Sequence, residues 1–150
     1  MGVPKQSLFE AVGGLKTLEA VHKIFYDKIY AHLWMQQFFE GHDQSLIELR
    51  QTQFMGMKFG GDIDYPGMDL ALAHRRMYIT PELFQVRQGL LRDSLREFGL
   101  AEDLIVRWLK IDQAFSKPII NPSLEDFECT DFKYEKPLIV PNPSLIEAEE

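Results

Sequence analysis

Residues 70–80 read LALAHRRMYIT, and one histidine, His74, stands there between a short apolar run and two arginines. Imidazole is the commonest protein ligand for a metal. A lone histidine beside Leu and Ala is, however, more often a core or capping residue. The surrounding residues 61–81 show too little apolar periodicity for more than a turn or two of helix, over about 69–74. This segment therefore has the fewest apolar contacts of its own and should be mobile, unless a further group such as a ligand packs against it.

Outside this stretch, residues 1–115 show helical periodicity, glycine-containing breaks and little strand-like alternation, which predicts an all-α domain. A first long helix is predicted after the glycines at 13 and 14, ending near residue 31. A second is predicted for residues 44–59, before the glycines at 60 and 61. The predicted apolar stripe of the first comprises Leu15, Leu18, Val21, Phe25 and Ile29.

Two further helices are predicted on the carboxyl-terminal side. Thr80 is a good cap, and Pro81 fits the first turn of a helix, where its missing N–H group costs nothing. Gly99 ends this helix, and the last helix runs from about residue 102 to residue 115. Their predicted buried faces comprise Leu83, Val86, Leu90, Leu91, Leu95 and Phe98 in one, and Leu104, Ile105, Trp108, Leu109 and Phe115 in the other.

Composition limits the class of protein. The 150 residues suit one domain, and 45% hydrophobic with 26% charged residues is typical of a globular protein. No apolar run approaches the roughly 20 residues that span a bilayer, and the first residues lack the order of a signal peptide. The net charge of −7 argues against nucleic-acid binding. We therefore expect a cytoplasmic protein with neither nucleic acid nor membrane as partner.

Cysteine and histidine spacing excludes two kinds of local site. Cys129 is the only cysteine, so the chain cannot form an intramolecular disulfide. The histidines are too far apart for one helix turn to present two of them, which excludes a local zinc motif. They are His22, His32, His42 and His74.

The last 35 residues differ in character from the rest. Residues 116–150 carry eight acidic and three basic side chains, so most of the net negative charge lies there. Five prolines predict an extended conformation. The apolar groups in LEDFECTDFKY and PLIV predict docking on a surface, either of the same chain or of a second subunit. The prolines are Pro118, Pro122, Pro137, Pro141 and Pro143.

Polar residues on apolar helix faces have two readings. Gln51 lies on the inner stripe of its helix, and Tyr26 adjoins Phe25 on the preceding one. Either these side chains hydrogen-bond each other or a backbone carbonyl and fix the packing, or they point at a polar ligand in an apolar pocket. Arg50, Arg75 and Arg76 are likewise either ordinary solvated charges or partners for the carboxylates of a buried cofactor.

Six motifs together resemble the truncated haemoglobins, and most of all their group I. In chain order they are LFEAVGG, FYDKIY, FFEG at 38–41, RQTQFMGMKFGG at 50–61, DYPGMDLALAH at 64–74 and YIT at 78–80. Each is weak alone, but they occur in the family's order and at nearly its spacing, over about residues 7–119. The resemblance implies a two-over-two helical sandwich around haem. Residues 1–119 would be the globin domain and 120–150 a Pro-rich acidic extension.

The resemblance also implies the cofactor and its ligand. His74 falls at the position of the family's proximal histidine, so it is the expected iron ligand of a non-covalently bound haem b. Tyr26 and Gln51 match the distal pair that hydrogen-bonds the gas ligand, and Ile47 stands where some relatives have a second glutamine. Some relatives bind iron with a histidine at the position of Arg50, so a free sixth position is expected here.

The remaining haem contacts follow residue by residue. Phe39 matches the phenylalanine that packs flat on the porphyrin, and Arg50 and Tyr65 match residues that reach the propionates. Arg75 is a further candidate at the rim. The expected pocket walls are Ile79, Phe84 and Val86.

Three functions are compatible with this resemblance. The first is reversible binding of O2, NO or CO at a five-coordinate iron. The second is a haem enzyme, either an NO dioxygenase that needs an external reductase or a peroxidase-like relative. The third is a gas or redox sensor that acts through the carboxyl-terminal tail. The oligomeric state is left open.

Overall fold

The computed structural model describes residues 6–66, 77–120, 140 and 143, and in this part of the chain the regular elements are all helices, with no strand. The long helices are α2 (Leu15–Ala31), α3 (Gln44–Lys58), α5 (Pro81–Phe98) and α6 (Glu102–Ala114). Three short helices accompany them: α1 (Leu8–Val12), the 3₁₀ helix η1 (Met35–Phe38) and α7 (Ser116–Ile119). The prediction of an all-α domain is confirmed.

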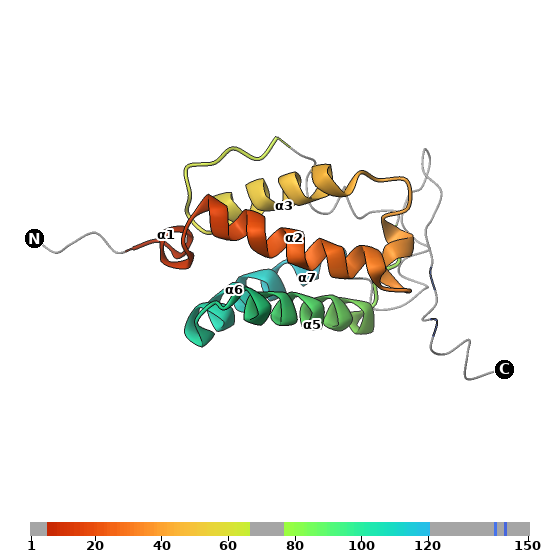
Figure 1. Ribbon diagram of the computed structural model, residues 1–150. Helices are drawn as coiled ribbons and strands as arrows, with labels where there is room; N and C mark the ends of the chain where they lie inside the picture. The colour runs from red at the N-terminus through yellow and green to blue at the C-terminus, as the bar shows by residue number, and fades with distance from the viewer. Residues whose placement is uncertain (1–5, 67–76, 121–139, 141–142, 144–150) are drawn as a thin grey trace, which may run out of the picture.

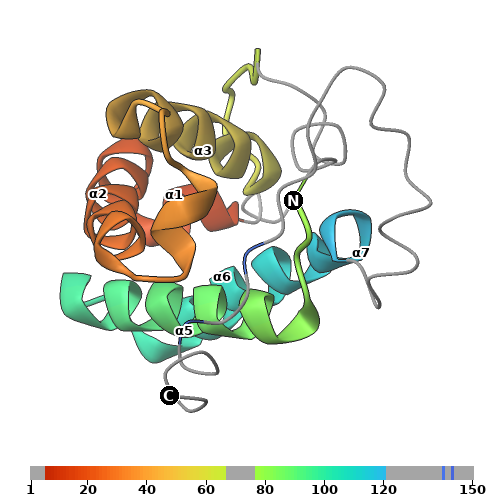
Figure 2. The same ribbon diagram turned by 90° about the vertical axis from the view of Figure 1, so that its right-hand side faces the viewer.

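The long helices form two layers. In Figure 1, α2 and α3 run in opposite directions and lie above the antiparallel pair α5 and α6. Figure 2, turned by 90°, shows the same separation. Helix α2 packs against both α3 and α5, so it is the element that joins the layers. This is the two-over-two helical arrangement that the resemblance to truncated haemoglobins implies.

Local signals explain where the helices begin and end. The Thr80 hydroxyl accepts a hydrogen bond of 3.0 Å from the Leu83 N–H group, which is an N-cap bond, and Pro81 occupies the first turn of α5. Gly99 has a φ of 93°, a left-handed conformation that favours glycine, and it ends α5. Asp43 is the N-cap of α3, and its carboxylate accepts from the Ser45 N–H group.

Most of the predicted core is buried, with exceptions at the helix ends. Leu18, Val21, Phe25 and Ile29 are at most 1% exposed. Leu15 is 45% exposed and Phe98 38% exposed, so their prediction as core residues is wrong. Both lie at helix termini, where the stripe extends beyond the neighbouring helices. The largest fully buried side chain is that of Trp108.

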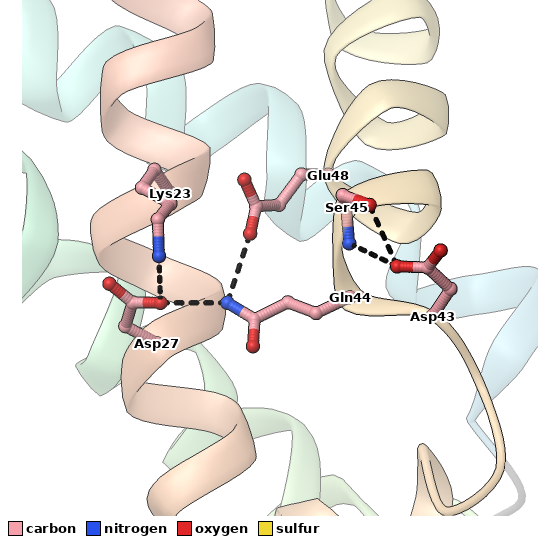
Figure 3. Close-up of polar contacts among 6 residues, drawn as sticks. All are labelled: Lys23, Asp27, Asp43, Gln44, Ser45 and Glu48. Carbon is pink, nitrogen blue, oxygen red and sulfur yellow. Dashed lines mark hydrogen bonds and ion pairs between the residues drawn. The ribbon is translucent and has the colours of Figure 1, made fainter.

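Two sets of polar contacts join α2 to α3. Inside, His22 Nδ1 and Thr52 Oγ1 form a hydrogen bond of 2.7 Å. On the surface, the Gln44 amide donates to Asp27 on α2 and to Glu48 on α3, while Lys23 pairs with Asp27 (Figure 3). The Lys23 hydrogen bond, followed by that of Gln44, holds the pKa of Asp27 below its usual value. The contacts of Asp27 are solvent-exposed and that of Glu48 is partly buried, so the fully buried bond contributes more to the fixed register.

The chain after α6 is not extended throughout. Residues 116–119 are helical, so the prediction of an extended tail is wrong at its beginning. Pro118 fits this single turn because the first N–H groups of a helix need no partner inside the helix. Further on, the Val140 carbonyl accepts a hydrogen bond of 2.8 Å from the Trp34 indole, and both residues are buried. At this point the tail docks on its own chain.

Among the helices of the described residues, none has the length and apolar character required to span a membrane.

Candidate ligand cavity

A cavity of about 280 Å³ lies between the two helical layers. Both layers and η1 contribute to its walls, which are mostly apolar and aromatic. Among the described residues, its lining comprises Phe25, Tyr26, Ile29, Met35, Phe38, Phe39, His42, Ile47, Arg50, Gln51, Phe54, Tyr65, Met77, Ile79, Leu83, Phe84, Arg87, Asp112, Phe115 and Ile119. An apolar cavity with a few polar groups is the usual form of a small-molecule or cofactor site.

The two polar residues that the sequence singled out both reach this cavity. Tyr26 comes from α2 and is 5% exposed, whereas Gln51 comes from α3 and is half-buried. Within the described residues, neither the Tyr26 hydroxyl nor the Gln51 amide has a hydrogen-bond partner. The interpretation in which Tyr26 and Gln51 hydrogen-bond each other or a backbone carbonyl is therefore wrong. Polar groups without a protein partner in the wall of an apolar cavity are well placed to bond a ligand there, so the arrangement favours a ligand that bonds them.

Packing fixes the orientation of the Tyr26 ring. Its centroid lies 4.8 Å from that of Phe25 and 5.9 Å from that of Phe39, both in edge-to-face geometry. The His22–Thr52 bond joins α2 one turn before Tyr26 to α3 one residue after Gln51. The backbone that carries the two polar groups is thereby held in place.

Burial determines the protonation state of Tyr26. Burial raises the pKa of its hydroxyl well above the usual value of 10, and the positive charge of Arg87 only partly opposes this rise. Tyr26 is therefore a neutral hydroxyl, able to donate a hydrogen bond, at any physiological pH.

The lining also contains the residues expected at the cofactor's edge. Arg50 on α3 is half-buried, and its guanidinium donates to the Gln53 side chain at 3.0 Å. The Tyr65 ring packs edge-to-face on Phe54, with centroids 5.2 Å apart. Arg50 supplies a positive charge here, which suits a carboxylate.

The structure brings most of the predicted site residues to one place. Eight line the cavity: Tyr26, Phe39, Ile47, Arg50, Gln51, Tyr65, Ile79 and Phe84. Val86 does not line it and instead packs, half-buried, against the core. His74 and Arg75, like Arg76, lie outside the described residues. Among the residues that are described, no three His, Cys, Asp or Glu side chains gather as a metal site.

Sequence reasoning missed a charged pair in the cavity wall. Arg87 on α5 and Asp112 on α6 form an ion pair of 2.6 Å, and both line the cavity. The sequence contains a sign of this pair, because Arg87 and Asp112 each occupy a position on an otherwise apolar, inward-facing side of a helix. Arg87 falls between Phe84 and Leu91, and Asp112 follows Trp108 by four residues. Opposite charges on the inner faces of consecutive helices mark two candidates for an ion pair, but the sequence does not show how the two helices pack.

Comparison with known proteins places the chain in a family. The sequence profile of the bacterial-like globin family matches residues 7–120, so the chain belongs to that family. A group 1 truncated hemoglobin of Tetrahymena pyriformis is 27% identical over 116 residues, covering 77% of this chain and 96% of that protein. The resemblance to truncated globins is thus confirmed.

Solved structures agree with this assignment. The structure of the Tetrahymena pyriformis protein in its Fe(III) form has a TM-score of 0.73 at 27% identity, covering 77% of this chain and 99% of that chain. A 2/2 hemoglobin of Synechococcus, in a cyanomet state with covalently attached heme, has a TM-score of 0.72 at 26% identity, with the same coverage.

Proposed function

We propose that this protein binds haem b non-covalently and takes up O2 and other diatomic gases reversibly, with His74 as the iron ligand. The observation that carries the proposal is the pair of unpartnered polar groups, the Tyr26 hydroxyl and the Gln51 amide, at an apolar cavity. The related proteins are haemoglobins, and two of their structures are described as containing Fe(III) or heme. The position of His74 in the motif DYPGMDLALAH supports its role as ligand.

The residues present fit such a group. The walls formed by Phe38, Phe39 and Phe84 are apolar and suit a flat hydrophobic macrocycle. Arg50 and Tyr65 would hold its propionates. When bound, the haem would supply an iron with a free position for a gas.

The chain's own residues would then select and retain the ligand. Tyr26 would donate its hydroxyl hydrogen to a ligand in the cavity, and the Gln51 amide would add a second hydrogen bond. Both line a mostly apolar cavity, where hydrogen bonds to a partly negative ligand are stronger than in bulk water. Ile47 is apolar and lines the same cavity, so it adds no third polar group from α3 beside Tyr26 and Gln51.

Absorption spectra of the purified protein, oxidised and reduced, test the cofactor. We expect a Soret band in the wild type and its loss or marked shift in His74→Gly. Added imidazole should restore the wild-type spectrum, because it replaces the missing ligand. An unchanged Soret band in His74→Gly without imidazole would refute the assignment of His74.

Rapid-mixing measurement of O2 release tests the role of Tyr26. Tyr26→Phe should raise the O2 dissociation rate about tenfold, the effect of losing a hydrogen bond worth about 1.4 kcal/mol. Tyr30→Phe is the matched control, since Tyr30 lies one turn further along α2 and its hydroxyl donates to the His42 carbonyl. Equal dissociation rates in Tyr26→Phe and the wild type would reject the role of Tyr26.

A further inference from the structure

The ion pair of Arg87 and Asp112 is a second polar feature of the same cavity, on the side of α5 and α6. The Arg87 side chain is 19% exposed, whereas that of Asp112 is only 3% exposed. Within the described residues, Asp112 is the one carboxylate that Arg87 contacts. The two ends of the pair are thus unequally exposed, and the guanidinium is the more accessible of the two.

The carboxylate is also the better compensated of the two groups. Its Oδ2 atom accepts from Arg87 at 2.6 Å and from the Gln88 amide at 3.1 Å. The guanidinium has five N–H donors. Among the described residues, one hydrogen bond engages them, and this is the bond to Asp112. The remaining donors are available to a ligand.

Aromatic rings hold the guanidinium at the cavity wall. Its Cζ atom lies 5.3 Å from the centroid of Phe25 and 5.5 Å from that of Phe84, within the range of cation–π contacts. Phe25, Phe84 and Arg87 all line the cavity. The positive group is therefore fixed in position.

The influence of the ion pair on the pKa of Tyr26 also indicates a positive charge at the cavity. Arg87 lowers the pKa of the Tyr26 hydroxyl, and Asp112 raises that pKa by a smaller amount. The pair thus leaves a net positive potential at the hydroxyl. A buried ion pair is also weak evidence for added stability, because an apolar pair of similar volume often serves as well.

We propose that Arg87 is a specificity-determining residue of this cavity, where its guanidinium favours small inorganic anions over neutral diatomic gases. Asp112 is the positioning residue that holds the guanidinium and moderates its charge. This inference rests on the proposed function, because it assigns a ligand class to the same haem site. It adds anions to the ligands of the site and assigns their recognition to a residue outside the Tyr26 and Gln51 pair.

The test measures two equilibria on the haem-loaded protein: azide binding to the oxidised form and carbon monoxide binding to the reduced form. Arg87→Met should weaken azide binding about tenfold, corresponding to about 1.4 kcal/mol, and leave carbon monoxide binding unchanged. Arg87→Lys should retain azide affinity, because it keeps the charge. Arg92→Met is the matched control, since Arg92 is exposed on the same helix and its loss changes the net charge equally.

Asp112→Asn separates an electrostatic role from a structural one. This variant keeps an oxygen acceptor for Arg87 but removes the compensating charge, so azide should bind more tightly than in the wild type. A purely structural role predicts weaker binding in both variants. If Arg87→Met fails to fold, the direction of change in Asp112→Asn decides: tighter azide binding supports the proposal, and unchanged or weaker binding overturns it.

Two results for Arg87→Met would also overturn the role of Arg87. One is an equal loss of affinity for azide and for carbon monoxide, and the other is an azide affinity equal to that of the control Arg92→Met. These failures differ from failure of the proposed function. If the proposed function fails, the wild type itself shows no Soret band. If the wild type shows the Soret band but Arg87→Met keeps the azide preference of the wild type, only the role of Arg87 is refuted.

Discussion

Acidification should destabilise this protein through His22. The imidazole is 1% exposed, its Nδ1 atom bonds Thr52, and its Nε2 atom has no partner among the described residues. Burial, with a smaller contribution from the charge of Arg87, lowers the pKa of His22 from 6.5 to about 3. The folded protein therefore keeps this side chain neutral at pH values where the unfolded chain protonates it.

The sign and size of the effect follow from proton linkage. Below pH 6.5 the unfolded state binds a proton that the folded state does not, so the free energy of unfolding falls as the pH falls towards 3. At pH 5 the folded-state imidazole is still neutral, and the unfolded-state pKa lies 1.5 units higher. At about 1.36 kcal/mol per unit, His22 should remove about 2 kcal/mol of stability between pH 7.5 and pH 5.

Urea unfolding followed by circular dichroism, at pH 7.5 and at pH 5, measures this loss. The matched variant is His22→Asn, whose amide takes roughly the place of Nδ1 but does not titrate. Other histidines and the carboxylates contribute equally to both proteins, so they cancel in the comparison. The wild type should lose about 2 kcal/mol more than the variant. Equal losses would show that His22 is not buried in its neutral form and would refute this reasoning.

Three further outcomes test other parts of the structure. A chain ending at residue 120 lacks the Val140 carbonyl that accepts from the Trp34 indole, so Trp34 fluorescence should shift to longer wavelength. An unshifted emission band would contradict this docking of the tail. Gly99→Ala should cost about 1 kcal/mol in thermal unfolding, because the φ of 93° is strained for alanine although no atom lies within 4 Å of its added Cβ. Gln44→Ala removes an exposed hydrogen bond to Asp27 and a partly buried one to Glu48, and it should change stability by only about 0.5 kcal/mol. A loss several times larger would show that the contacts of Figure 3 fix the two helices.

The sequence predicts the helices well and the short elements poorly. The limits of α5 follow from Thr80, Pro81 and Gly99, and the start of α2 from the glycines before it. Helices α1, η1 and α7 were not predicted individually, because a segment of four or five residues is too short to show a periodicity.

The sequence likewise predicts some features of the candidate site and not others. Tyr26 and Gln51 could be singled out in the sequence, because a polar residue on an apolar stripe is visible there. That they have no hydrogen bond to each other could not be read from the sequence, because periodicity places residues on a face but does not give the distance between two faces. Val86 shows the same limit: its spacing puts it on the buried side of α5, but the helix is rotated so that Arg87 lines the cavity instead.

The sequence by itself determined where the long helices begin and end and which side of each faces inward. Caps, prolines and glycines act on backbone groups within a few residues, so their effect is local. Only the tertiary structure decided that Arg87 and Asp112, 25 residues apart, meet in one wall of the cavity. Such a pairing depends on how α5 and α6 pack, and that packing is set by the combined contacts of all the helices rather than by any single segment.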